Sequence, residues 1–433
     1  MTLFIKLVVQ FANLIIMRLI SCLFLFFTVF SFSQTYDGDR VLTVRSYDSI
    51  NDQPKAKGAL GINMKLNGYY DVYGGLQDSE TFNIGQINVF GTDDSQSFKM
   101  DMYQTQIFIQ GDYVTKGGEN VKAVVEFDFW GGNGHMRLRK AYVETNHWQI
   151  GQNWNNFGDE VLWPNVMEWE GPPSGIWIRS PHIKYFNTFK NKEWVYEVSL
   201  EAPMVDYVSL GELEPLVEEE YQVTPDLTAA IKYKKEWGHI RFSSILRNIR
   251  YKFDGETDSF IGYGFTLSGI YKTERKNNLQ FQLIGGKGIN AYLTSVSGLG
   301  YDGYPTIEGD FDATPSYGGW ISYEYYFTPK FHSNIVFGYT KYRFEDMERY
   351  ILSEELPNDP IDDVLVLGGD YSSYHSYGIL NFMYDPFERM TIGLELDYGR
   401  KDVDYNGLAN DIFIDENKER DAMRISFGFM FYL

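Results

Sequence analysis

The sequence predicts an all-β protein, a transmembrane antiparallel β-barrel of about sixteen strands with short turns at one end and long loops at the other. Three observations carry this prediction. The C-terminal segment alternates between apolar and mixed side chains up to the last residue. The connectors between alternating segments are sorted by length. Aromatic residues make up 17% of the chain, which exceeds the needs of a core and is typical of the girdles of membrane barrels.

The side chains of the C-terminal segment fall on two faces, because successive residues of a strand point to opposite sides. An exposed apolar edge would promote aggregation, so we expect this strand to close against the first one and to turn its apolar face to lipid. Its aromatic-rich end resembles the signal that the barrel-assembly machinery reads, although the last residue is Leu rather than Phe. The apolar face comprises Ile425, Phe427, Phe429, Phe431 and Leu433.

Alternating segments recur along the chain after residue 58, and an even number of them is the rule in bacterial barrels. The sixteen segments lie near 62–74, 100–113, 120–130, 135–145, 147–151, 176–187, 193–202, 226–235, 239–251, 260–272, 278–287, 317–327, 331–343, 374–384, 390–400 and 420–433. Three of them assign their faces clearly, and the side chains expected to face lipid are Ile261, Tyr263, Phe265, Leu267, Ile321, Tyr323, Tyr325, Phe327, Ile392, Leu394, Leu396 and Tyr398. Small and charged residues on the opposite faces predict a polar lumen that can hold water.

The connectors differ in length according to their position in the chain. Those after even-numbered segments are short, namely 115–119, 146, 188–192, 236–238, 273–277, 328–330 and 385–389. Those after odd-numbered segments are mostly long, namely 75–99, 152–175, 203–225, 288–316, 344–373 and 401–419. Outer-membrane barrels have this arrangement, with short turns in the periplasm and long loops outside. Soluble sandwiches and propellers have no reason to sort their loops in this way.

Composition argues against two other classes of protein. The mean hydropathy is -0.31, and no long apolar run follows the first 33 residues, which disfavours a helical membrane protein. The formal net charge of -21 disfavours nucleic-acid binding, because that function needs a basic surface. Much of the acidic charge lies in connectors such as 212–220 and 359–363, so a basic lumen is compatible with it.

The N-terminus is expected to be an export signal. Residues 1–33 combine Arg18 with a long apolar stretch, and Met17 is an alternative start. The only cysteine, Cys22, lies inside that stretch, where the nearby charge and the continuing apolar run disfavour lipidation. We expect 34–58 to be a flexible periplasmic lead-in and 59–433 to form the barrel, in the outer membrane of a Gram-negative bacterium.

One part of the chain resembles a known family. Residues 135–144 read His-Met-Arg-Leu-Arg-Lys-Ala-Tyr-Val-Glu, and 150–157 read Ile-Gly-Gln-Asn-Trp-Asn-Asn-Phe. Upstream, 126–129 form an acidic-aromatic strand, and Glu-Gly-Pro at 170–172 and Arg-Ser-Pro at 179–181 follow downstream. Together these motifs resemble the DcaP-like family of trimeric outer-membrane porins.

The resemblance covers about residues 62–200 and implies a homotrimeric porin that passes small solutes. Two features depart from the family pattern. The usual helical N-terminal extension is missing, since 34–58 is short and lacks heptads, and Lys184 stands where a second arginine is expected. The barrel prediction is unaffected, but the family's preference for small anions transfers less directly.

Charged residues on lumen faces are the candidates for selecting solutes. The basic candidates are Arg137, Arg139, Arg179, Lys232, Arg241 and Arg247, and the acidic ones are Glu126 and Asp128. The acidic pair lies on the strand before the first two arginines, within pairing reach. Two interpretations stay open, a basic ladder that attracts anionic solutes and a set of ion pairs that only stabilises the wall.

The connector 152–175 is a candidate constriction, as the third loop of the family that the chain resembles. Folded into the barrel, it would narrow the pore and set the size limit for solutes. The alternative is a surface loop packed against a neighbouring subunit. Its aromatic and acidic candidates are Trp154, Phe157, Asp159, Glu160, Trp163, Glu168, Trp169 and Glu170.

Metal and catalytic motifs are weak. Asp402, Asp404 and Asn406 match the first half of a calcium loop, but Phe413 stands where a bidentate Glu would be needed, which favours an ordinary turn. The six histidines lack metal-ligand spacing, and no nucleophile elbow or phosphate-binding glycine loop is present in the sequence. No cofactor is expected.

The sequence therefore favours an outer-membrane porin for passive diffusion of small hydrophilic solutes, with anions among the candidates. Its expected partners are membrane lipid and lipopolysaccharide, two further copies of the chain, the solutes and the barrel-assembly machinery, and no nucleic acid. Two alternatives stay open. One is a barrel enzyme of the lipase or protease type, for which Ser376 beside His375 would be a rim pair. The other is a surface adhesin that the barrel only anchors.

Overall fold

The computed structural model describes residues 42–47, 54–77, 79–206, 217–219, 221–253, 255–273, 276–353 and 363–433. The expected export signal, with Met17 and Cys22, lies outside these residues, as do most residues of the acidic connectors 212–220 and 359–363. Within the described ranges, no helix has the length and apolar content to cross a membrane.

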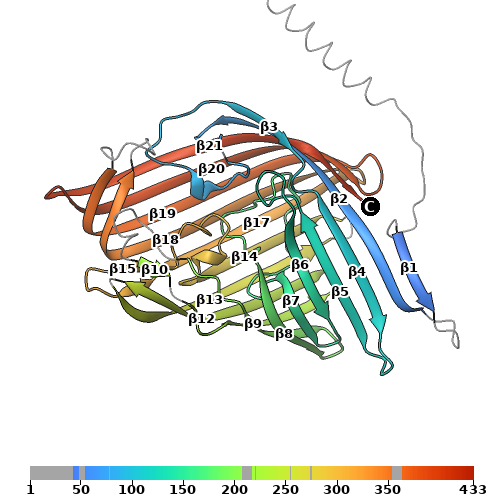
Figure 1. Ribbon diagram of the computed structural model, residues 1–433. Helices are drawn as coiled ribbons and strands as arrows, with labels where there is room; N and C mark the ends of the chain where they lie inside the picture. The colour runs from blue at the N-terminus through green and yellow to red at the C-terminus, as the bar shows by residue number, and fades with distance from the viewer. Residues whose placement is uncertain are drawn as a thin grey trace, which may run out of the picture. The chain divides into compact units, whose positions relative to one another are not determined.

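Sixteen antiparallel strands form a closed barrel wall (Figure 1). Each of the sixteen segments expected from the sequence overlaps one wall strand, so the predicted fold is confirmed. In order around the wall, the strands are β2 (Pro54–Tyr73), β4 (Gln106–Val114), β5 (Asn120–Asp128), β6 (Arg137–Glu144), β7 (Trp148–Trp154), β8 (Arg179–Phe189), β9 (Trp194–Glu201), β11 (Asp226–Lys235), β12 (Gly238–Phe253), β13 (Glu256–Lys272), β14 (Asn278–Lys287), β17 (Pro315–Thr328), β18 (Phe331–Ser353), β19 (Asp363–Tyr384), β20 (Met390–Ala409) and β21 (Ile412–Tyr432).

The barrel closes where β21 pairs with β2, from Asn63 opposite Tyr432 to Tyr73 opposite Met423. The N–H of Leu433 donates to the carbonyl of Ile62 at 2.8 Å, and the reverse bond measures 3.1 Å. The last strand therefore has no free edge where it meets the first, as the sequence predicted.

Shorter elements complete the structure. Strand β1 (Leu42–Tyr47) pairs with residues 54–60 of β2, so the expected lead-in contains one strand and the start of another. Strand β3 (Ser97–Asp101) pairs with residues 67–71 of β2, and β10 (Val217–Glu219) pairs with β12. The remaining elements are the two-stranded sheet of β15 (Gly303–Pro305) and β16 (Phe311–Ala313) and the 3-10 turns η1 (Ile84–Gln86) and η3 (Asn290–Tyr292).

The faces of the wall strands alternate as expected for a membrane barrel. In β20, Leu394 is 54% exposed on the outside, whereas the neighbouring Glu395 and Asp397 are 1% and 0% exposed on the inside. The twelve side chains expected to face lipid in β13, β17 and β20 are all outward and exposed. The polar residues between them face the interior because strand side chains alternate.

Two connectors expected to be loops, 344–373 and 401–419, are instead largely strand. Strand β20 runs to Ala409 and β21 begins at Ile412, so Asn410 and Asp411 make a two-residue turn with φ of 50° and 63°. Such turns match the twist of a hairpin and let the pairing continue. The apolar alternation stops earlier because the membrane ends there, not because the strands do. The prediction of loops was wrong here for that reason.

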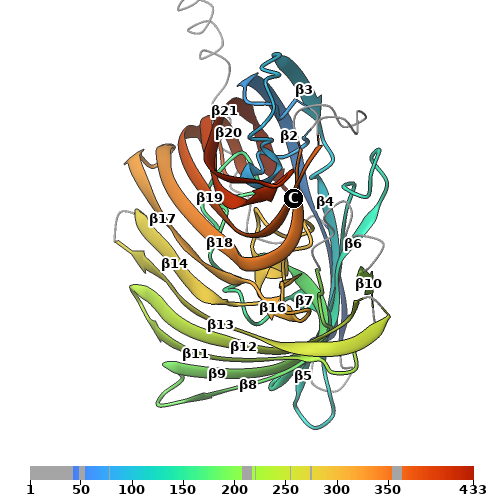
Figure 2. The ribbon, with the colours of Figure 1, turned by 90° about the vertical axis from the view of Figure 1, so that its left-hand side faces the viewer.

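The wall is uneven in height (Figures 1 and 2). Strands β5, β6 and β7 have 9, 8 and 7 residues. Strands β18, β19, β20 and β21 have 23, 22, 20 and 21 residues. The β18–β21 hairpins therefore extend well past the short β5–β7 wall at the long-loop end.

Three segments from the long-loop end fill much of the interior. We call them the first loop (74–96, with η1), the inserted loop (155–178) and the late loop (288–314, with η3). Phe82 of the first loop, Phe157 of the inserted loop and Tyr292 of the late loop are each at most 1% exposed. They belong to apolar clusters that include wall residues such as Tyr342 and Tyr377. The lumen is thus largely packed, and open space remains in particular places.

Candidate functional site

The inserted loop leaves β7 and first contacts β12, on another part of the wall. The guanidinium of Arg241 donates to the carbonyls of Asn156 at 2.6 Å and Gly158 at 2.8 Å. Asp159 is 2% exposed and accepts a hydrogen bond from His239 at 2.7 Å. The cationic partners hold the pKa of this carboxyl well below its usual range despite its burial, which by itself would raise the pKa. The start of the loop is therefore fixed to the wall by charge-assisted contacts.

The same loop then contacts β20 and β2. The carboxylate of Glu395 accepts the main-chain N–H groups of Met167 at 2.8 Å and Glu168 at 2.7 Å. The ammonium of Lys65 donates to the carbonyl of Met167 at 2.6 Å and lies 3.9 Å from the ring centroid of Trp169. The loop is thus held at two separate parts of the wall, β12 on one side and β20 with β2 on another, and passes through the interior between them.

Glycines of the wall make room for this loop. Gly393 and Gly428 lie opposite each other on β20 and β21. A Cβ on Gly393 would lie 2.3 Å from Sδ of Met167, and a Cβ on Gly338 would lie 2.7 Å from Cβ of Pro172. The close approach of the loop to the wall therefore requires residues without side chains at these positions.

The main cavity, of about 600 Å³, lies between the inserted loop and the β4–β8 part of the wall. Its aromatic lining consists of Trp130, Trp154, Trp163, Trp169 and Trp177. Its charged lining consists of Arg137, Arg139, Lys140, Arg179, Glu126, Asp128, Glu160 and Glu170. The hydrogen-bonded ladder between β6 and β7 covers only Ala141 to Glu144 of β6. Trp154 packs beside the preceding part of β6, which is not paired with β7.

Three of the four cations in the main cavity are paired with acids of the wall. Arg137 contacts Asp128 at 2.6 Å, Arg139 contacts Glu126 at 2.7 Å and Asp128 at 2.9 Å, and Lys140 contacts Glu126 at 3.0 Å. The two acids and the two arginines therefore lie within contact of each other, as the sequence predicted.

Arg179 differs from the other cations. It forms no ion pair within the part of the chain that the structure describes, and its guanidinium lies 4.8 Å from the ring centroid of Trp154. Stacking on an indole holds the guanidinium plane while leaving its N–H groups available.

Acidic side chains stand opposite, on the inserted loop. Glu170 accepts a hydrogen bond from Asn83 of the first loop at 2.9 Å. Burial, with a smaller contribution from the neighbouring Glu168, raises the pKa of Glu170 to about 8. Near neutral pH this carboxyl is therefore mostly protonated, and the main cavity carries less negative charge than its sequence suggests.

A second cavity of about 610 Å³ adjoins the main one toward the long-loop end. The two cavities share Thr81, Asn83, Trp130 and Glu170 in their linings. Open space therefore continues from the first loop down to the wall arginines.

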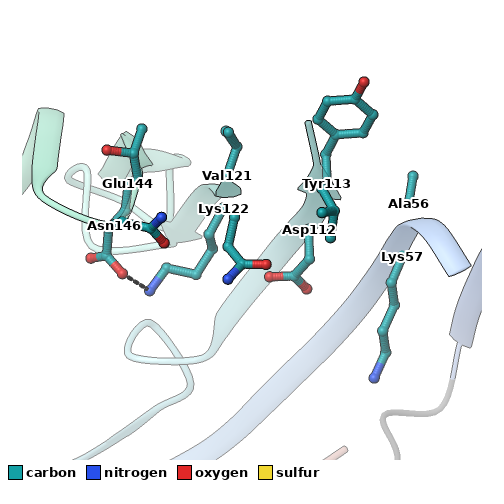
Figure 3. Close-up of a pocket in the computed structure, with 11 residues that line it drawn as sticks. Ala56, Lys57, Asp112, Tyr113, Val121, Lys122, Glu144 and Asn146 are labelled. Atoms are coloured by element: carbon teal, nitrogen blue, oxygen red, sulfur yellow. Dashed lines mark ion pairs between the residues drawn. The ribbon is translucent and has the colours of Figure 1, made fainter. Parts of the chain in front are cut away.

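A third cavity, of about 410 Å³, lies at the short-turn end of the same wall (Figure 3). Its inward charges sit directly opposite one another on adjacent strands, with Lys57 across from Asp112, Asp112 across from Lys122, and Lys122 across from Glu144. The ammonium of Lys122 contacts Glu144 at 2.7 Å, which Figure 3 marks. This row of alternating charge continues the polar lining toward the end of the barrel.

The expected site residues divide into three groups, of which the third contains Lys232, Arg241 and Arg247. Arg137, Arg139, Arg179, Glu126, Asp128, Trp154, Glu160, Trp163, Trp169 and Glu170 line the main cavity. Phe157, Asp159 and Glu168 are instead buried at 0%, 2% and 7% exposure and fix the loop.

The expectation that Arg241 and Arg247 line a pore is corrected, because they are only 2% and 1% exposed. Both are covered by inserted segments. Arg247 contacts Asp226 at 3.1 Å and Asp302 of the late loop at 2.8 Å. Lys232 lies nearby, 3.5 Å from Asp159. On strands β11 and β12, the basic residues therefore form structural ion pairs rather than a continuous basic ladder along a pore.

Several contributors to the main cavity were missed in the sequence. Lys140 follows the Arg-x-Arg motif and enters the lumen because the register shifts at Glu126 and Phe127. Trp177 lies beyond the expected end of the loop at 175. Glu395 was predicted to face the lumen, but its contact with the inserted loop was not predicted, since 227 residues separate it from Glu168.

Two weaker expectations are also corrected. Asp402, Asp404 and Asn406 lie in the extended strand β20, where Asp402 contacts Arg400 at 2.8 Å, and they form neither a turn nor a calcium loop. No cluster of potential metal ligands occurs within the described ranges. His375 is 0% exposed and hydrogen-bonded to Ser295 at 2.7 Å, so it does not form a rim pair with the neighbouring Ser376.

Comparison with solved structures places this geometry among known barrels. The chain aligns with the outer membrane channel DcaP of Acinetobacter baumannii over 89% of its own length and 100% of that chain, with a TM-score of 0.65 and 17% identity. The barrel has the DcaP fold. It also aligns with the anion-selective porin from Comamonas acidovorans, over 87% of its own length and 100% of that chain, with a TM-score of 0.52 and 11% identity. No family model and no curated protein matches the sequence.

The DcaP fold and the outward apolar face together place the barrel in the bacterial outer membrane. A closed barrel satisfies every backbone group of the wall inside lipid, and its alternating strands put apolar residues against the acyl chains. In this DcaP-like barrel, the end that carries the C-terminus and the short turns is expected to face the periplasm.

Proposed function

We propose that the protein is an outer-membrane porin through which small hydrophilic solutes diffuse passively. The three cavities supply the observation that supports this function, since all of them follow the β2–β6 wall from the first loop to the periplasmic turns. The inserted loop covers the opposite wall and leaves this side as the route. Along this route, tryptophans of the inserted loop line the same cavity as the wall arginines.

We propose further that the route favours anions. Four cations line the main cavity, and the acids bound to three of them neutralise only part of that charge. Across from them, protonation of Glu170 removes one negative charge near neutral pH. A confined polar space surrounded by protein of low dielectric focuses the field of its remaining charge on passing ions.

A homotrimer is the assembly that we propose. The seven residues of β7, tilted by about 45°, span roughly 16 Å, less than the apolar band of about 25 Å of such barrels. Ile150 of β7, and Ile109 and Ile183 of β4 and β8, the strands that flank the short β5–β7 wall, are nonetheless at least 50% exposed on the outside. A neighbouring copy packed here would cover the short wall better than lipid does.

Planar-bilayer recording of the refolded protein tests the channel. We expect stable conductance in KCl, and a larger conductance when residues 160–170 are deleted because that deletion removes the centre of the inserted loop. Reversal potentials in a KCl gradient then test selectivity, with the double variant Arg137→Ala/Arg139→Ala shifted toward cations. Arg343→Ala, an exposed arginine paired with Glu345 outside the cavities, is the control. A complete absence of current from both the intact protein and the deletion variant would refute the porin.

A further inference from the structure

We propose that the main cavity is a binding site for a sugar acid, meaning a pyranose ring that carries a carboxylate. This inference rests on the proposed porin function and names the solute class that the route selects. Three features of the main cavity support it, namely its aromatic surfaces, one available cation and its uncharged polar side chains.

The aromatic surfaces form a connected set. The ring centroids of Trp163 and Trp177 are 4.4 Å apart, those of Trp154 and Trp163 are 6.3 Å apart, and those of Trp177 and Trp320 are 5.9 Å apart. The indole rings of Trp154, Trp163 and Trp177 are only partly buried, and each borders the main cavity. Flat aromatic surfaces of this size bind the apolar C–H face of a pyranose while its hydroxyl groups point sideways.

Arg179 supplies the anchor for the carboxylate. The other three cations of the main cavity already have wall acids within 3.0 Å, whereas Arg179 has no ion-pair partner among the described residues. Its stacking on Trp154 fixes the guanidinium beside the aromatic surfaces. A planar guanidinium binds a carboxylate through two parallel hydrogen bonds, which orients the attached ring.

The polar lining fits hydroxyl groups. Gln104, Gln106, Thr294 and Ser297 border the same space, and amides and hydroxyls both donate and accept hydrogen bonds. An aromatic carboxylate would use the tryptophans and Arg179 but none of these four side chains. A small inorganic anion would use only the arginine. The volume of about 600 Å³ lies within the range of small-molecule sites.

Calorimetric titration of the full-length protein in detergent measures this binding whether or not the channel conducts. D-galacturonate is the probe, with D-galactose, benzoate and acetate as comparators. We expect galacturonate to bind at least tenfold more tightly than galactose, because only galacturonate can make the charge-assisted carboxylate–guanidinium contact. We expect benzoate and acetate to bind more weakly than galacturonate.

Two variants separate the contributions. Arg179→Ala should reduce galacturonate affinity to that of galactose, and Trp163→Ala should weaken both sugars by several-fold while preserving their ratio. Trp237→Ala, in a periplasmic turn remote from the main cavity, is the matched control and should change neither affinity.

Equal binding of galacturonate and acetate, or binding of benzoate at least as tight as that of galacturonate, would overturn the sugar-acid assignment. Loss of KCl conductance with intact galacturonate binding would refute the porin and leave the binding site standing. Conductance without galacturonate binding would refute the binding site alone.

Discussion

The carboxylate of Glu395 accepts the main-chain N–H of Met167 at 2.8 Å, and this contact joins the wall strand β20 to the middle of the inserted loop. The carboxylate also accepts from Glu168 and from Asn381, so its acceptor capacity is used by the fold rather than by solute. Glu395 is therefore one of the wall side chains that hold the inserted loop in the lumen, together with Arg241 and Lys65.

Glu395→Ala should release the inserted loop. Each charge-assisted hydrogen bond contributes about 1.5–3 kcal/mol, and two main-chain amides lose their acceptor. We expect a thermal midpoint several degrees lower and more frequent changes of current level in single-channel traces. Glu256→Ala, on an exposed part of β13, should change neither. Unaltered current and stability in Glu395→Ala would show that other contacts hold the loop.

Gly393→Val should displace Met167. A side chain at this position would overlap Sδ, since even a Cβ would lie 2.3 Å from it. We expect destabilisation of about 1–3 kcal/mol, the usual range for overpacking. The double variant Gly393→Val/Met167→Ala should recover most of that stability because the shorter side chain vacates the space. Urea unfolding of the wild type and the two variants measures the recovery, and its absence would place the strain elsewhere.

Two arginines should separate selectivity from stability. Arg179→Gln should shift the reversal potential toward cations and leave the unfolding free energy within about 1 kcal/mol of the wild type, since no ion pair is lost. Arg247→Gln should lower the unfolding free energy by about 3–5 kcal/mol, because it leaves Asp226 and Asp302 buried without their partner. Similar losses of stability in both variants would contradict this division of roles.

Selectivity should depend on pH through Glu170. Its pKa of about 8 lies above the ordinary value of 4.5, so the folded protein retains a proton that the unfolded chain releases. The associated stabilisation is complete below about pH 4.5 and is lost as pH rises through about 8. Ionisation also adds negative charge to the main cavity, so raising the pH from 6 to 9 should reduce anion preference. Glu170→Gln should flatten both dependences, and an unchanged pH profile would exclude Glu170 as the titrating group.

Deleting Phe431–Leu433 should block assembly before it affects transport. The main chain of Leu433 makes two hydrogen bonds to Ile62, and Phe431 lies opposite Met64 where the last strand meets the first. Heat-modifiable mobility on gels measures barrel closure, and the deletion should abolish it. Phe413→Ala, an exposed residue at the far end of the same strand, should still close.

The wall could be predicted from the sequence because lipid imposes a period of two on every strand that crosses it. The side chains of β20 show this directly, with Leu394 outside and Glu395 inside. Past the membrane that constraint ends, and paired strands and loops then look alike, which is why 401–409 and 412–419 were taken for a loop.

The contents of the lumen were harder to predict. The wall glycines that admit the inserted loop were visible as small inward residues, but their partners are remote in sequence, as with Met167 and Gly393. The motif residues Arg137 and Arg139 could be placed beside Glu126 and Asp128 because adjacent strands pair locally. Arg241 and Arg247 are covered by distant segments, and periodicity does not reveal such coverage.

The short strand β1 has a consequence for how the barrel selects its register. Sliding β21 along β2 by two residues would leave every side chain on its own face, so alternation alone does not forbid the slip. Residues 54–60 of β2 are already paired with β1, directly below the position that Leu433 takes opposite Ile62. Strand β1 therefore occupies the β2 edge that β21 would need for a slip toward the N-terminal end of β2.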